Sequence, residues 1–485
     1  MDLAARRYEN KNEAITGDSF SSRCSRRRRL PEQAWIMAEL HPLDTGFIEL
    51  EDSDRHISLG IGAVAIVAGA SPTRAEFAAA LNAGLQRNPR LRQRVRRTPW
   101  DLTAPVWEDD PNFDLAHHIR WKALPRPADE QTLRELVAEE LAERFDRDHP
   151  LWECLVVDNL AQDRWAVLVR AHHCMVDGIS GVTLFENFCD QVAGDGPAVV
   201  AERSARPGLA ELAARAVRLP WEAPRLAISM LRALAPVLYA AARPAAGSSF
   251  NGPIGRQRRY AVARATLPQI REIRDAFGVT VNDVAVAAVA SAYRAVLLCR
   301  DEQPARGAVR VLIPVSTRTA EAKDVLDNRV SALLPILPVE VADPLERLTA
   351  VHEQISTHRS RGEADAQRSL LSLATLLPSA MVAWAFRLAS HYPQHTVSAL
   401  ATNVPGPRHR LTMHGCEVLE ILPCIPIAMR LRTTIAILSY ADRLVFGITG
   451  DYDSTPDIDL LAAGIEAGVA ELLSRSRSVV LSDRP

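Results

Sequence analysis

Two adjacent histidines, His172 and His173, precede an aspartate and a glycine, Asp177 and Gly178, in the stretch VLVRAHHCMVDGISGVTLF. A neutral imidazole accepts a proton near pH 7, so the motif indicates a general base. The carboxylate lies four residues after His173. It can reach back to the ring and fix its tautomer, or it can point away and pair with an arginine that holds the loop. Gly178 allows a close approach or a positive φ at the bend. The pattern predicts a proton-transfer centre and leaves both roles of the aspartate open.

Other kinds of site fit these residues less well. A metal site of the H-E-x-x-H type needs a further His or Glu at helical spacing, and none accompanies this motif, so we expect no metal ligands. A serine hydrolase needs G-x-S-x-G, but Ser180 is followed directly by Gly181. A polar turn with a purely structural role is compatible with the local residues and stays open as an alternative.

The motif lies where a predicted strand meets a predicted helix. Residues 151–160 and 164–171 are apolar runs joined by the short turn Ala-Gln-Asp. This pattern predicts a β-hairpin whose second strand leads into the histidines. After Gly178, apolar residues at positions 182, 185 and 188 predict a helix. Loops at such junctions commonly hold reactive groups.

The rest of the chain alternates between strand and helix patterns. Thr73 and Glu76 form a capping box that opens a helix, and Pro89 stops it. Ala441 and Asp442 form the turn of a second predicted hairpin. We further expect a strand at 58–68, a helix near 130–145, a helix at 281–297, a strand at 308–317 and a closing helix at 456–475.

The composition is that of a globular protein with two domains. The 485 residues exceed one ordinary core, and 47% of them are hydrophobic and 24% charged. Lys plus Arg (57) and Asp plus Glu (59) leave a net charge of -2, which gives no global electrostatic reason to expect nucleic acid as a partner. The seven cysteines contain no CxxC pair. This usage favours a reducing cytosol over a disulfide framework or a structural zinc site.

Three segments differ from the rest. Residues 1–35 lack the apolar core of a secretory signal and are basic near their end, so we expect a disordered leader, with weak contact to anionic lipid headgroups as the alternative. Residues 207–246 are basic and rich in Ala and Leu, which fits a helical connection packed on the protein or an amphipathic segment on a membrane surface. The uncharged run at 369–386 reaches the lower length of a spanning helix, but Pro378 in its middle favours two short buried or interfacial helices.

The spacing His-x-x-x-Asp-Gly resembles that of acyl-CoA-dependent acyltransferases of the chloramphenicol acetyltransferase type, a superfamily that includes condensation domains. The doubled histidine narrows the resemblance to the bacterial wax ester synthase/acyl-CoA:diacylglycerol acyltransferase family. Companion stretches occur in the order of that family: HPLDTGFIELED at 41–52, Pro-Leu-Trp-Glu at 150–153, Asn-Asp at 282–283 and ATNVPGP at 401–407. With similar stretches between them, they span roughly residues 40–475.

The resemblance implies an α/β (α+β) fold of two chloramphenicol acetyltransferase-like lobes. Each lobe would be a mixed β-sheet with helices, and an active-site tunnel would lie between the lobes. On this basis the chain divides into a disordered basic leader (1–35), an N-terminal lobe with the histidine motif (36–200), a helical connection (201–257) and a C-terminal lobe (258–485).

The resemblance also implies the reaction. His173 would take the proton from an acceptor hydroxyl, which then attacks the thioester carbonyl of a long-chain acyl-CoA. The acceptor would be diacylglycerol, giving triacylglycerol, or a fatty alcohol, giving a wax ester. His172 would support the base, and Asp177 and Gly178 would shape the turn.

The pair Asn282 and Asp283 is similar to a second functional pair of the family. It would hold the lobes together or position substrate. A simpler interpretation of the same residues is a helix N-cap, because asparagine before an apolar helix caps well.

Acyl-CoA would enter as a substrate, and we expect no cofactor. Long-chain, apolar substrates imply a cytoplasmic protein that is peripherally associated with the inner membrane face or with lipid droplets. Two alternatives remain: a condensation-type acyltransferase that uses another thioester donor or acceptor, and a catalytically inactive paralogue that binds lipid.

Overall fold

The structure is a computed structural model that describes residues 38–85, 88–97, 105–190, 248–316, 330–360, 394 and 396–482. The chain separates into two compact units, residues 1–36 and 37–485, and every described residue belongs to the second. The predictions for the leader, for the segment 207–246 and for the apolar run 369–386 lie outside the described residues.

A six-stranded mixed sheet carries the histidine motif. Its strand order is β12-β13-β2-β7-β6-β5. The strands are β12 (Thr412–Met413), β13 (Cys416–Cys424), β2 (Gly60–Ala68), β7 (Arg164–His172), β6 (Trp152–Leu160) and β5 (Ile119–Ala123). Strands β6 and β7 form the predicted antiparallel hairpin, and only β5 and β6 run parallel. Strand β7 therefore ends on the first histidine, as the sequence predicts.

A second six-stranded mixed sheet has the order β10-β9-β11-β14-β15-β8. The strands are β10 (Val330–Leu333), β9 (Val311–Ser316), β11 (Ala399–Pro405), β14 (Thr433–Tyr440), β15 (Arg443–Asp451) and β8 (Arg258–Thr266). Strands β14 and β15 form the predicted hairpin, with Ala441 at a φ of 51° in its turn. Both strands are buried along almost their whole length, so residues on both faces of this part of the sheet are covered.

A small three-stranded sheet and the helices complete the described fold. The small sheet contains β1 (Ala38–Glu39), β4 (Val106–Asp109) and β3 (Gln93–Arg96). The helices are α1 (Pro42–Ser53), α2 (Arg74–Leu85), α3 (Leu115–His118), α4 (Glu130–Ala142), α5 (Gly178–Glu186), α7 (Leu267–Phe277), α8 (Val281–Cys299), α9 (Pro344–Ser360) and α12 (Ile458–Ser482), together with a short 3-10 turn at Pro89–Arg92. The capping box that opens α2 is confirmed, because the Thr73 N–H donates to Glu76 Oε2 at 2.9 Å and the Glu76 N–H to Thr73 Oγ1 at 3.3 Å.

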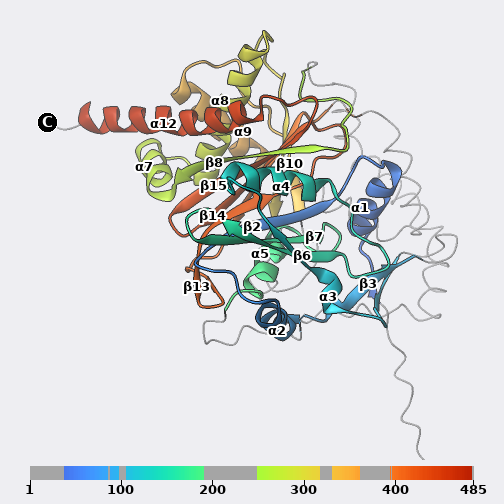
Figure 1. Cartoon of the computed structure of the whole chain (residues 1–485). Helices are drawn as coiled ribbons and strands as arrows, with labels where there is room; N and C mark the ends of the chain where they lie inside the picture. The colour runs from blue at the N-terminus through green and yellow to red at the C-terminus, as the bar shows by residue number, and fades with distance from the viewer. Residues whose placement is uncertain are drawn as a thin grey trace, which may run out of the picture. The chain divides into compact units, whose positions relative to one another are not determined.

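One edge of the first sheet is formed by strands from the C-terminal part of the chain. Strand β13 comes from the last quarter of the chain, yet it pairs antiparallel with β2 in the sheet of the histidine motif, where its warm colour stands beside cool-coloured strands (Figure 1). A Cβ at Gly447 of β15 would lie 1.8 Å from the carbonyl oxygen of Pro423 in β13, so a glycine is required where the two strands approach. Strands β12 and β13, which lie in the predicted C-terminal lobe (258–485), therefore belong to the sheet of the histidine motif.

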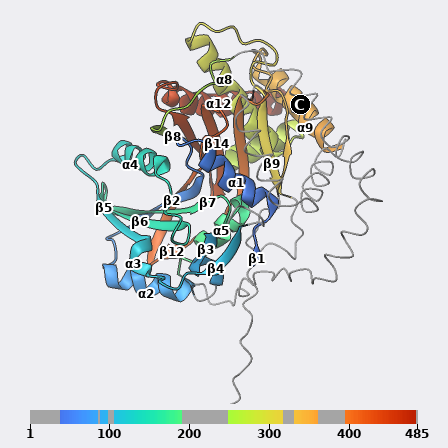
Figure 2. The ribbon, with the colours of Figure 1, turned by 90° about the vertical axis from the view of Figure 1, so that its right-hand side faces the viewer.

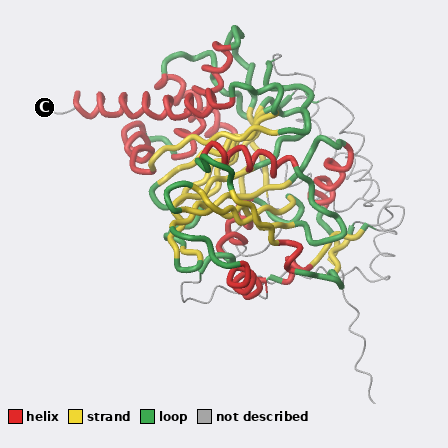
Figure 3. The backbone as a smooth tube through the Cα atoms, viewed as in Figure 1, coloured by secondary structure: helices red, strands yellow, loops and turns green. Residues whose placement is uncertain are grey.

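Apolar layers on both faces of the sheets form the core. Figure 3 shows the strands (yellow) in the middle of the described part, with helices (red) around them. Helices α8, α9 and α12 cover one face of the second sheet (Figure 1). Helix α4 packs on one face of the first sheet, and α2 and α5 pack on the other (Figure 2). Within the described ranges, α8 alone has the length and composition of a membrane-crossing helix, but most of it is buried in this core.

Candidate active site

The histidine motif is held by the backbone on both sides of β7. The N–H of His172 donates to the carbonyl of Leu151 at 2.8 Å, and the N–H of His173 donates to the carbonyl of Leu59 at 2.9 Å. The chain then turns through residues 173–177 into α5. The four predicted motif residues therefore come together at a strand-to-helix junction, because β7 is a central strand paired along its length with β2 and β6.

The ring of His173 lies against helix α1. It stacks on Phe47 with ring centroids 4.2 Å apart and an angle of 25° between the planes. Burial lowers the pKa of His173 below its usual value, and the charge of Asp177 opposes this shift. A lowered pKa keeps the imidazole neutral near pH 7, which is the protonation state of a general base.

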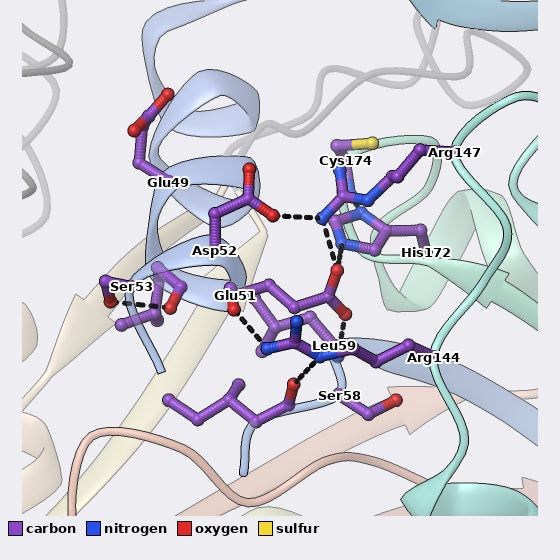
Figure 4. A network of polar contacts seen from close by, with 12 residues as sticks. Glu49, Glu51, Asp52, Ser53, Ser58, Leu59, Arg144, Arg147, His172 and Cys174 are labelled. Carbon is purple, nitrogen blue, oxygen red and sulfur yellow. Dashed lines mark hydrogen bonds and ion pairs between the residues drawn. The ribbon is translucent and has the colours of Figure 1, made fainter. Parts of the chain in front are cut away.

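His172 is fully buried and faces a carboxylate of α1 (Figure 4). Its Nδ1 accepts the N–H of Cys174 at 3.1 Å, so the proton of the neutral ring is on Nε2. That Nε2 lies 3.5 Å from Oε2 of Glu51, within ion-pair range. Burial lowers the pKa of His172, and Glu51 acts in the opposite direction. His172 thus holds the backbone of the loop that carries His173, and its predicted supporting role in the reaction stays a prediction.

Glu51 is the centre of this buried network (Figure 4). Its Oε1 accepts the N–H of Leu59 at 2.9 Å, and its Oε2 pairs with the guanidinium of Arg147. Burial by itself raises the pKa of Glu51. The hydrogen bond from His172 and the charge of Arg147 outweigh burial and lower the pKa to about 2. The carboxylate therefore stays ionised beside the histidine motif.

Glu51 and Arg147 were not predicted as site residues from the sequence. They are 96 residues apart, so no local spacing connects them. A signal for both was available, because each lies in a stretch that resembles the family, 41–52 for the glutamate and 145–156 for the arginine.

Asp177 caps helix α5. Its Oδ1 accepts both the N–H and the Oγ–H of Ser180 at 2.9 Å, and the Asp177 N–H donates to Ser180 Oγ at 3.0 Å. This reciprocal arrangement is a capping box, for which the pattern Asp-x-x-Ser was the signal. The predicted structural role of Asp177 thus has a concrete geometry, and its orienting effect on His173 stays a prediction.

Gly178 allows the two sheets to meet at the motif. A Cβ on this residue would lie 2.6 Å from Cγ2 of Val404, which belongs to β11 of the second sheet. Its φ is outside the left-handed region. Of the two reasons proposed for this glycine, close approach therefore applies.

Asn282 and Asp283 lie in the first turn of α8. The N-cap interpretation of Asn282 is wrong, because Thr280 caps the helix and forms a capping box with Asp283. Oδ2 of Asp283 also lies 2.8 Å from Nδ1 of His352 on α9, and Oδ1 of Asn282 accepts from Nδ2 of Asn403 at 3.2 Å.

This pair reaches the histidine motif only indirectly. Asn403 precedes Val404, the residue of β11 that contacts Gly178. Strand β11 therefore links the start of α8 to the start of α5. The pair binds elements within the second half of the chain, and its predicted role in positioning substrate stays a prediction.

Two protein-family models together match most of the chain. Residues 40–285 match the model of the wax ester synthase/diacylglycerol acyltransferase catalytic domain, and residues 326–473 match that of the WS/DGAT C-terminal domain. A probable diacylglycerol O-acyltransferase of Mycobacterium tuberculosis is 42% identical over 448 residues, which cover 91% of this chain and 97% of the relative.

Solved structures agree with the fold. The wax ester synthase/diacylglycerol acyltransferase of Marinobacter aquaeolei VT8 superposes with a TM-score of 0.65 at 25% identity, covering 91% of this chain and all of the other. The first condensation domain of the calcium-dependent antibiotic synthetase has a TM-score of 0.59 at 15% identity, covering 91% of this chain and 96% of the other, and it shares the fold alone. The predicted two-lobed fold type is confirmed. The chain belongs to the wax ester synthase/diacylglycerol acyltransferase family.

Proposed function

We propose that this protein transfers a long-chain acyl group from acyl-CoA to the free hydroxyl of diacylglycerol, producing triacylglycerol and CoA. The observation that carries the proposal is the setting of His173: a partly buried imidazole that stacks on Phe47 and is held at the junction of β7 and α5. The names of the relatives supply the substrate class, because the Mycobacterium tuberculosis relative is called a probable diacylglycerol O-acyltransferase.

In the proposed reaction, His173 removes the proton of the acceptor hydroxyl as the oxygen attacks the thioester carbonyl. The tetrahedral intermediate collapses, the carbon–sulfur bond breaks, and the CoA thiolate takes the proton back from His173. Proton and electron pairs balance without a covalent enzyme intermediate or a cofactor. Asp177, Gly178 and the buried pair of His172 and Glu51 hold the loop while the proton moves.

A second acceptor has support in the name of the Marinobacter protein, which is called a wax ester synthase as well as a diacylglycerol acyltransferase. We therefore propose that fatty alcohols also serve as acceptors, at a lower rate than diacylglycerol.

The test supplies purified full-length protein with labelled palmitoyl-CoA and one of three acceptors: dioleoylglycerol, hexadecanol or none. Labelled triacylglycerol from wild type but not from His173→Ala supports the proposal. If folded wild-type protein forms no product with either dioleoylglycerol or hexadecanol, a condensation-type enzyme or an inactive lipid-binding paralogue is favoured. Full activity of the His173→Ala variant would overturn the general-base assignment.

The substrates also lead us to propose a location: the cytoplasmic face of the inner membrane or the surface of lipid droplets, by peripheral contact. Co-sedimentation with liposomes of stated composition, at low and high salt, tests this. We expect the protein to pellet with the liposomes at low salt. Protein that stays entirely in the supernatant under all conditions would contradict peripheral association.

A further inference from the structure

A cluster of three metal-ligating side chains lies apart from the histidine motif. His117 is at the end of α3, and Asp146 and His149 lie in the loop before β6. One ligand atom from each lies within 4.8 Å of the other two. The rings of His117 and His149 have centroids 4.0 Å apart, and Nε2 of His149 lies 3.8 Å from Oδ2 of Asp146.

The cluster has a carboxylate behind it that fixes the orientation of His149. Nδ1 of His149 lies 3.4 Å from Oδ2 of Asp110, a buried residue. Asp110 is itself held, because its Oδ1 accepts the N–H of Asn112 at 2.9 Å and its N–H donates to the carbonyl of Arg92 at 2.9 Å. A carboxylate on one nitrogen of a histidine places the proton there and leaves the other nitrogen as a ligand. That other nitrogen, Nε2, is the one near Asp146.

The carboxylate of Asp146 is also oriented as a metal ligand would be. Its Oδ1 accepts the N–H of Asp148 at 3.0 Å, which fixes the carboxylate and leaves Oδ2 toward His149. Two ligands of a tetrahedral zinc ion, each about 2.1 Å from the metal, lie about 3.4 Å apart. The ligand atoms lie up to 4.8 Å apart and therefore need to approach by up to about 1.4 Å, which rotations of the exposed side chains of His117 and Asp146 provide.

We propose that His117, Asp146 and His149 form a binding site for Zn²⁺, with water in the fourth position. Two imidazoles and one carboxylate suit a borderline transition-metal ion, whereas Mg²⁺ and Ca²⁺ prefer oxygen ligands alone. We expected no metal ligands from the sequence, because no further ligand accompanies the histidine motif. His117 and His149 are far apart in the chain, and the pairing of β5 with β6 brings their segments side by side.

The site would clamp a segment that supports the active site. Asp146 and His149 flank Arg147, whose guanidinium pairs with Glu51 beside His172. His118, next to His117, stacks on Trp152 with centroids 4.5 Å apart. A bound ion would therefore join α3 to the loop 143–151 and restrict the motion of Arg147. The role is structural, and the ion takes no part in acyl transfer.

The test is calorimetric titration of ZnCl₂ into tag-free, EDTA-stripped full-length protein at pH 7.5. We compare wild type with the double variant His117→Ala/Asp146→Asn, whose changes are at exposed positions that leave the buried Asp110 in place. The matched control is His56→Ala. It removes a part-exposed histidine that also pairs with an aspartate but has no third ligand among the described residues. We expect one more Zn²⁺ per chain in wild type and control than in the double variant, or an affinity at least 10-fold higher.

A second measurement follows the loop itself. Hydrogen exchange of residues 143–151 should slow on addition of Zn²⁺ in wild type and in His56→Ala, and stay unchanged in the double variant. MgCl₂ should have no such effect. Equal Zn²⁺ stoichiometry and affinity in all three proteins, as binding to cysteines elsewhere would produce, overturns the proposal, and so does the absence of binding at 100 equivalents of Zn²⁺. Neither readout depends on the acyl-transfer proposal.

Discussion

The start of α5 and the start of α8 contain the same local structure and serve different ends. Each is a capping box in which side chain and backbone bond reciprocally, between Asp177 and Ser180 at α5 and between Thr280 and Asp283 at α8. At α8 the carboxylate also binds His352, so the polar groups join two helices.

The difference arises from what precedes each cap. Helix α5 follows a central strand that delivers His172 and His173, whereas α8 follows a short connection from α7. A capping box therefore builds a helix start in both places. The buried strand and the network around Glu51 distinguish the start of α5, where we propose the reaction centre.

The largest effect that distinguishes the two regions is expected for His173→Ala. Loss of the general base should lower kcat/KM by about 10²- to 10⁴-fold. The variant also loses the ring stack with Phe47, so its melting temperature separates lost chemistry from lost stability. Initial rates with palmitoyl-CoA and diacylglycerol, beside a thermal melt, measure both. Activity within 10-fold of wild type would show that another group takes the proton.

Glu51→Gln tests whether the buried network belongs to the reaction centre. Removing one partner of a buried ion pair should lower the free energy of unfolding by about 3 kcal/mol. It should also lower kcat more than it raises KM, because the loop of His173 loses support. Urea denaturation and steady-state kinetics measure these effects.

Asp52→Asn is the matched control for that variant. Asp52 is the next residue of α1 and contacts the same Arg147 at 3.3 Å, but its side chain is 42% exposed. The change in unfolding free energy should stay below about 1 kcal/mol. Equal losses of unfolding free energy in the two variants would show that the negative charge on α1 matters and that the contact of Glu51 with His172 does not.

Asp283→Ala should affect stability and leave the chemistry intact. The variant loses a cap acceptor and the contact with His352, which should lower the free energy of unfolding by about 1–2 kcal/mol. A double-mutant cycle with His352→Ala, followed by urea denaturation, should give a coupling energy of about 0.5–1 kcal/mol. If kcat/KM fell 100-fold in a variant that is as stable as wild type, the start of α8 would be a second reaction centre.

The smallest effect concerns the pH dependence of stability. Burial lowers the pKa of His172 and His173 in the folded protein, and the network lowers that of Glu51 to about 2. The unfolded chain therefore binds more protons as the pH falls, first at histidine near pH 6.5 and then at glutamate near pH 4.5.

Stability should accordingly be highest above about pH 6.5 and should decrease as the solution is acidified. Urea midpoints at pH 7.5, 6.5, 5.5 and 4.5 measure the slope. In Glu51→Gln the decrease below pH 5 should be smaller than in wild type. A wild-type midpoint that rises between pH 6.5 and 4.5 would contradict the lowered pKa values.

Much of the fold was predictable because its elements follow local patterns. The hairpin of β6 and β7, the capping box at Thr73 and the helix α8 each depend on residues close together in sequence. The exchange of β13 into the first sheet was not predictable in this way. Strand β13 pairs with β2, which lies far earlier in the chain, so no local pattern assigns it to that sheet.

The candidate site also contains some residues that were predictable from local patterns and others that were not. His173 and its turn were predictable from one heptapeptide, since strand, turn and helix signals coincide there. The N-cap of α8 was misplaced by two residues, because Thr280 and Asn282 are both good caps and only the backbone path chooses between them.

By itself the sequence determined the type of chemistry, the junction that presents His173 and, through the order of its motifs, the family. Only the tertiary structure decided that Glu51 and Arg147 surround His172, that Gly178 meets Val404, and that His117 lies beside His149. The physical reason is distance along the chain. Residues within one turn of helix or one strand interact whatever the rest of the protein does, whereas these partners meet only after sheets pack and pay the entropy of closing long loops.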